Sequence, residues 1–174
     1  MAGASHGSLA SAILRAKKYA RDFGTEIPID WGMNRINMEH VFDAALHHLT
    51  RWMDGGEAAP IQPLIEFAGT PADVMRDARG TAVGGVRLPQ ADVPLGQNTA
   101  TPRTPDIFSL LRGAYHPFAA PVIDDLYTDE TDFVRQFTAA AQRAEASGVL
   151  LPRDIAPLIE DAITGYREAR GLAS

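Results

Sequence analysis

The stretch NMEHVFDAALHHLTRWMDGG, from Asn37 to Gly56, has the clearest helical pattern in the sequence and decides the fold class. Asn37 is a good N-cap residue, and a pair of glycines is a typical helix stop. The apolar residues between them recur at helical spacing and form one stripe: Met38, Val41, Phe42, Ala45, Leu49, Trp52 and Met53. The stretch therefore predicts an amphipathic helix.

Two histidines, His40 and His47, lie seven residues apart on the polar back of this helix, with Asp43 between them. Metal ligands usually converge in a closed pocket, where ordered neighbours hold the ligand side chains in place through hydrogen bonds. These side chains instead lie opposite the apolar stripe. We interpret them as solvated helix surface and expect neither a metal nor another cofactor. His48, at the edge of the stripe, is expected at the margin of the core.

Further helical patterns occur at both ends of the chain. One follows Ser8 as its cap and ends at Gly24. Another is expected from about residue 131 to 147. The last is expected to begin at the cap Asp154, with Pro157 tolerated in its first turn. The residues expected to face inward from the middle one are Phe133, Val134, Phe137, Ala141 and Ala144.

Proline and glycine become frequent between Ala58 and Pro105. Two runs, 63–67 and 83–88, are rich enough in apolar residues to be strands, and 76–80 between them is typical of a turn. The sequence therefore predicts a mainly α fold with a small β-hairpin element.

Composition excludes several classes of function. The chain has 174 residues, of which 45% are hydrophobic, and its net charge of −6 argues against a nucleic-acid partner. It has no cysteine, which rules out disulfides and thiolate chemistry. No apolar stretch reaches the roughly 18 residues that span a bilayer. We therefore expect a soluble, cytoplasmic protein without a nucleic-acid or membrane partner.

The N-terminal residues Ala2 to Gly7 are small and polar and predict a loop directly before a helix. His6 lies in this loop, where bulky neighbours do not cover it. Imidazole takes up and releases protons near neutral pH, which suits a general base. From these residues alone, a histidine in a flexible N-terminal tail is a simpler interpretation than a catalytic histidine.

The segment Gly3-Ala4-Ser5-His6 resembles the catalytic-histidine loop of α/β-hydrolases, where the histidine follows the last core strand and precedes a C-terminal helix. Later stretches are similar to the C-terminal part of the bacterial alpha/beta hydrolase domain-containing protein family. These stretches are residues 44–52, 84–94, 115–118 and 147–152. The run Gly-Gly-Val-Arg-Leu-Pro at 84–89 is the most specific. The resemblance covers nearly the whole chain, from residue 3 to about 163.

This resemblance implies the C-terminal portion of an α/β-hydrolase fold whose central sheet lies upstream of the chain. It implies a carboxylic-ester hydrolase in which His6 is the catalytic histidine and the nucleophile and triad acid come before it. We therefore expect a fragment that lacks the nucleophile and is inactive alone. Ser5 and Ser8 are not expected to stand on a nucleophile elbow, and the sequence favours neither Asp22 nor Asp30 as the acid.

The expected organisation is a single partial domain over residues 1–174. Its parts are the catalytic-histidine loop and helices (1–57), the β excursion (58–105) and the C-terminal helical segment (106–174). The alternative function is a non-enzymatic helical interaction module derived from the same family. A helix built to cover a parallel sheet exposes its apolar stripe when the sheet is absent. Such a stripe could bind the missing N-terminal hydrolase portion or a second copy of the chain.

Overall fold

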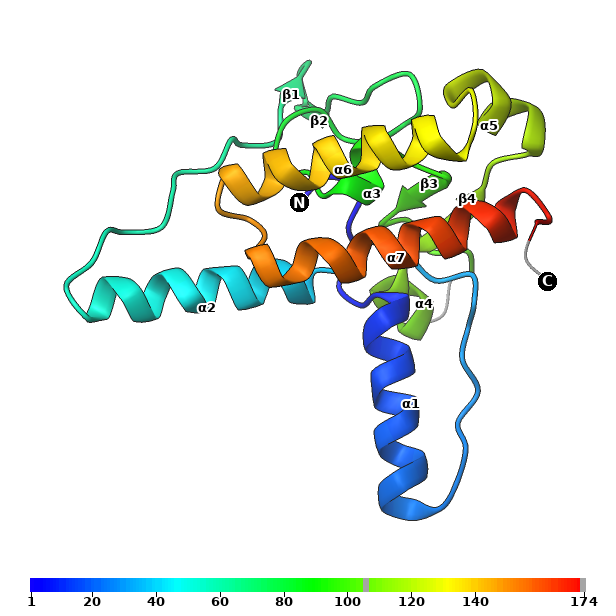
Figure 1. Ribbon diagram of the computed structural model, residues 1–174, viewed down its shortest axis with the longest axis horizontal. Coiled ribbons are helices and arrows are strands. Elements are labelled where there is room, and N and C mark those ends of the chain that lie inside the picture. Colours follow the sequence, from blue (N-terminus) through cyan, green and yellow to red (C-terminus); the bar gives the residue numbers. More distant parts are fainter. Residues whose placement is uncertain (105–106, 173–174) are drawn as a thin grey trace.

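The computed structural model describes residues 1–104 and 107–172 (Figure 1). The described fold is mostly helical, with two small antiparallel strand pairs where the sequence predicts one hairpin. None of the helices in these residues is long and apolar enough to cross a bilayer. Pro105, the expected end of the excursion, lies outside the described ranges. The elements are α1 (Leu9–Phe23), α2 (Glu39–Met53), β1 (Phe67–Ala68), β2 (Asp73–Val74), α3 (Pro89–Asp92), β3 (Gly96–Thr99), α4 (Ile107–Arg112), β4 (Ala114–Pro117), α5 (Ala120–Leu126), α6 (Glu130–Ala146) and α7 (Pro152–Ala169).

The core forms around α6 and α7, which run side by side (Figure 1). Phe133 of α6 is fully buried. Its ring centroid lies 5.0 Å from that of Tyr127, 5.8 Å from that of Phe137 and 4.9 Å from that of Tyr166. Aromatic pairs at these separations add attraction beyond their buried area. This four-ring cluster, Tyr127, Phe133, Phe137 and Tyr166, holds the two helices together, and the predicted burial of Phe133 and Phe137 is confirmed.

The start of α7 differs from its prediction. The helix begins at Pro152, so Asp154 is its third residue and Pro157 lies inside it. The carboxylate of Asp154 accepts a hydrogen bond of 3.1 Å from the backbone N–H of Leu151. Asp154 therefore binds the N–H just before the helix from within the first turn, and it is not the cap itself.

The β excursion forms no straight strands where the sequence predicts them. Segments 63–67 and 83–88 do lie side by side, because Glu66 N–H donates to the Val83 carbonyl at 3.0 Å. Gly84 and Gly85 both have a φ of +71°, however, which bends the second segment out of the extended conformation. The regular pairing is between β1 and β2, and between β3 and β4. The turn predicted at 76–80 is confirmed by a hydrogen bond of 2.9 Å from Gly80 N–H to the Asp77 carbonyl.

Helices α1 and α2 project from the body of the molecule (Figure 1). None of the fifteen residues of α1, all of them described, is buried. In α2, likewise described throughout, Ala44 alone is buried, whereas Phe42 is 67% exposed. The predicted amphipathic pattern is present, but its apolar stripe faces solvent. Exposed apolar side chains on these two helices are Leu14, Tyr19, Phe23, Phe42, Leu46, Leu49, Trp52 and Met53.

Candidate functional site

The loop that carries His6 is fixed at several points. Gly7 N–H donates to the carbonyl of Leu111 in α4 at 2.7 Å. The fully buried side-chain amide of Asn34 donates to the carbonyls of Gly3, at 2.6 Å, and Thr99, at 3.1 Å. Buried hydrogen bonds of this kind are costly to break. The loop is therefore held against β3 and α4, and it is not a flexible tail.

His6 itself is exposed, and its imidazole has no hydrogen-bond or ion-pair partner within the described residues. Each carboxylate considered as its orienting acid is paired with an arginine instead. Asp22 pairs with Arg21 at 2.8 Å, and Asp30 pairs with Arg103 at 3.0 Å. The structure thus presents an accessible imidazole on a fixed loop directly before α1, without a triad acid bound to it in this part of the chain.

Ser5 precedes His6 within Gly3-Ala4-Ser5-His6-Gly7, which has the G-x-S-x-G spacing of a nucleophile elbow. The prediction that the chain lacks its nucleophile does not take this spacing into account. An elbow serine stands exposed on a strained turn between a strand and a helix. The Ser5 hydroxyl instead lies 2.7 Å from the Gly7 carbonyl and 2.9 Å from the Arg112 carbonyl, and the residue is only 8% exposed. In this conformation the Ser5 hydroxyl closes the loop onto the end of α4.

His40 does not lie on solvated helix surface as predicted. Its Nδ1 is 3.2 Å from Oδ1 of Asp154, and its side chain is only 21% exposed. About two helical turns further along α2, Nε2 of His48 lies 3.0 Å from the carbonyl oxygen of Gly148. These two contacts join α2 to the start of α7 and to the loop before it. Their partners are far apart in sequence, so no local pattern indicates them.

The two other histidines are exposed: His47 on α2 and His116 on β4. In the ranges that the structure describes, no three histidine or carboxylate side chains are grouped as metal ligands would be. The geometry therefore leaves His6 as the histidine that is both accessible and held by a fixed loop immediately before a helix.

In a comparison with known protein families, residues 1–160 match the family described as "Alpha/beta hydrolase domain". No curated protein and no solved structure matches the chain. The matched range takes in the His6 loop, both strand pairs and most of the helical segment. The chain therefore belongs to the alpha/beta hydrolase domain family.

Proposed function

We propose that the chain is the C-terminal portion of a serine-type carboxylic-ester hydrolase, in which His6 is the general base. The observation that carries the proposal is the exposed imidazole on a loop fixed through Ser5, Gly7 and Asn34. A general base must be accessible to its substrate proton yet held in place. The membership of the chain in the alpha/beta hydrolase domain family also supports a hydrolase.

In this proposal His6 takes the proton of a serine hydroxyl as the serine oxygen attacks the ester carbonyl. The protonated imidazole then gives that proton to the leaving alcohol, and an acyl-enzyme remains. Water attacks the acyl-enzyme with His6 again as the base, which releases the carboxylic acid and restores the serine. His6 binds only the transferred proton and forms no bond to the acyl group, so its role requires only a lone pair and correct placement.

The nucleophilic serine and the triad acid come, on this proposal, from polypeptide outside these 174 residues, together with the central sheet. The buried, hydrogen-bonded hydroxyl of Ser5 supports this assignment. The chain would then be a single partial domain. Its exposed α1 and α2 faces would pack on that sheet, because helices that cover parallel strands bury their apolar stripe there.

The purified 174-residue chain is expected to show no turnover of a p-nitrophenyl ester above the rate of its His6→Ala variant. A histidine without a nucleophile has no proton to abstract for acyl transfer. A spectrophotometric assay of nitrophenolate release measures this. Robust turnover that Ser5→Ala abolishes would show that the nucleophile lies within the chain.

A second candidate function is a non-enzymatic helical interaction module. The observation that favours it is the α2 stripe, defined as Phe42, Leu46, Leu49, Trp52 and Met53, all of them exposed. Contiguous exposed apolar surface of this kind marks protein interfaces. In this proposal the α2 stripe binds the sheet-bearing portion of a hydrolase. When that portion is absent, the stripe binds a second copy of the chain.

We expect the chain alone to self-associate reversibly, and Leu46→Glu to weaken that association by about tenfold or more, since the change places a charge within a desolvated contact. Sedimentation-velocity ultracentrifugation across a concentration series measures the change. The control is Leu64→Glu, at a leucine of the β excursion that is also exposed. A chain that stays monomeric and melts cooperatively at every concentration would contradict the interaction module.

A further inference from the structure

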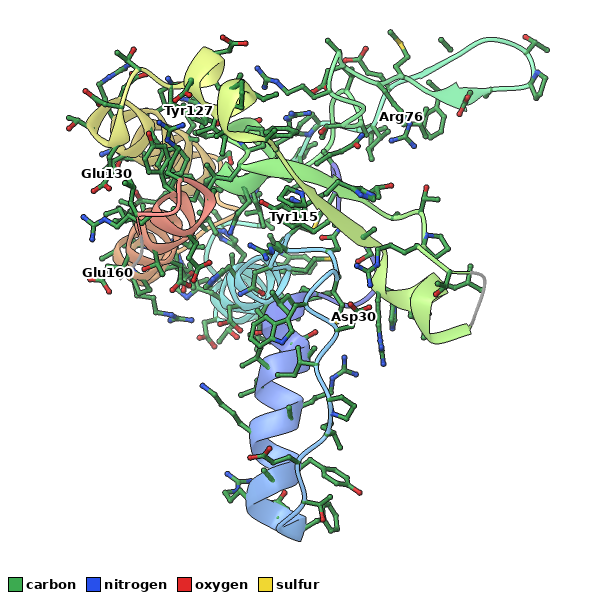
Figure 2. All side chains as sticks on the ribbon, turned by 90° about the vertical axis from the view of Figure 1, so that its right-hand side faces the viewer. Asp30, Arg76, Tyr115, Tyr127, Glu130 and Glu160 are labelled. Carbon is green, nitrogen blue, oxygen red and sulfur yellow. The ribbon has the colours of Figure 1, made fainter. Side chains whose placement is uncertain are left out.

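A cavity of about 350 Å³ lies between α1, α7 and the β3–β4 hairpin. Ligand sites for small molecules begin at about this size. Tyr115 of β4 lines it and lies at the centre of the molecule (Figure 2). The residues Gly3 to Gly7 do not contribute to its lining, so it is separate from the His6 loop. Its apolar wall consists of Leu9, Ile13, Val93, Leu95, Phe137 and Leu158.

One side of the cavity carries a fixed cation. The guanidinium carbon of Arg35 lies 4.1 Å from the centroid of the Tyr115 ring, a cation–π contact that orients the side chain. The Arg35 backbone is fixed as well, because its N–H donates to Oδ1 of Asn98 at 2.7 Å. Among the described residues the guanidinium has no carboxylate partner. Arg35 is therefore an exposed but oriented cation at a cavity wall, and its guanidinium donates no hydrogen bond to any described residue.

Helix α7 places two carboxylates on the lining. Asp161 and Glu168 are seven residues apart, which puts them on one face of the helix, and both are exposed at the open side. Within the described part of the chain neither has a cationic partner, and neither is paired with Arg35. The cavity thus has a positive group and negative groups on its lining that do not neutralise each other.

The lining also includes a polar group without a partner. The side-chain oxygen of Gln90, in α3, is buried and accepts no hydrogen bond from any described residue. An unpaired buried acceptor is costly, so natural proteins rarely keep one without a use. Burial raises the pKa of the Tyr115 hydroxyl, and the nearby Arg35 only partly offsets this, so the hydroxyl stays a neutral donor.

We propose that this cavity binds a small zwitterion with an apolar body, in the class of α-amino acids with apolar side chains. Arg35 receives the carboxylate, Asp161 and Glu168 attract the ammonium group, and the apolar wall takes the side chain. The proposal does not depend on the function proposed for His6.

Isothermal titration calorimetry of the full chain with L-phenylalanine tests the ligand class. We expect saturable binding, and about tenfold or weaker binding of phenylalaninamide, which lacks the carboxylate, and of N-acetylphenylalanine, which lacks the ammonium group. Equal affinity for either analogue would overturn the zwitterion assignment. So would the absence of saturable heat up to the solubility limit of L-phenylalanine.

Two variants locate the binding. Arg35→Gln is expected to weaken L-phenylalanine binding by about tenfold or more, whereas Arg51→Gln, which removes an exposed cation beside the α2 stripe, leaves it unchanged. Ala162→Leu, on the α7 wall, is expected to abolish binding by filling the cavity without altering charge. Circular dichroism melts check that each variant is folded. Binding that survives both cavity variants would show that the ligand sits on the exposed helix faces and would overturn the proposal.

Discussion

Replacing His6 with alanine is expected to lower kcat/KM for ester hydrolysis by about 10²–10⁴-fold, the usual contribution of a general acid–base residue. In this experiment the chain is combined with the polypeptide that, on the proposed function, supplies the serine. Without the imidazole, neither the serine nor the deacylating water loses its proton efficiently. The exposed His6 side chain makes no contact that the fold requires, so stability should not change. Steady-state turnover of a p-nitrophenyl ester measures the effect.

The control for this variant is His47→Ala, because His47 is an exposed histidine on α2. It should leave kcat/KM unchanged. Added imidazole should partly restore the activity of the His6 variant, since a small base can occupy the space left by the side chain. A loss no larger than that of the control would remove His6 from the catalytic machinery.

Phe133→Ala is expected to lower the free energy of unfolding by about 3–5 kcal/mol, the range for deleting a fully buried aromatic ring. The ring fills the space between Tyr127, Phe137 and Tyr166, and all three lose a neighbour when it is removed. Domains of this size have a total stability of about 5–15 kcal/mol, so the variant should be near its unfolding threshold.

Urea denaturation followed by far-ultraviolet circular dichroism measures the loss. Phe23→Ala is the matched control, because Phe23 at the end of α1 is 68% exposed and the same atoms are removed. Its effect should stay within about 0.5 kcal/mol. A Phe133 variant as stable as the Phe23 variant would show that the four-ring cluster does not hold α6 and α7 together.

Helical periodicity predicts the long helices α1, α2, α6 and α7, but not the short helices α3, α4 and α5, and it does not say which face packs. In α6 the pattern identifies the buried residues Phe133 and Phe137, because a large apolar surface lies within the same chain. In α2 the equally clear stripe is exposed, and the side containing His40 and Ala44 faces the body. The difference arises from which surfaces are available, and a local pattern holds no information about that.

The His6 site was predictable in part. Its small-residue loop and the following helix can be seen in the sequence, whereas the contacts that fix the loop join residues far apart in the chain. The Ser5 hydroxyl reaches the Arg112 carbonyl, and the Asn34 amide reaches Thr99. Only the fold brings these groups together. The G-x-S-x-G spacing around Ser5 is the opposite case: the pattern is local, but only the structure shows that the hydroxyl of this serine is hydrogen-bonded and the residue buried.

The role proposed for His6 is tested by finding which serine reacts with a fluorophosphonate, a reagent that labels activated serine nucleophiles. The measurement is mass-spectrometric mapping of the adduct after labelling of the 174-residue chain, alone and combined with the serine-bearing portion. We expect no adduct on the chain alone, and in the combined enzyme an adduct on a serine outside these residues whose formation slows in His6→Ala. An adduct on Ser5 would contradict this expectation.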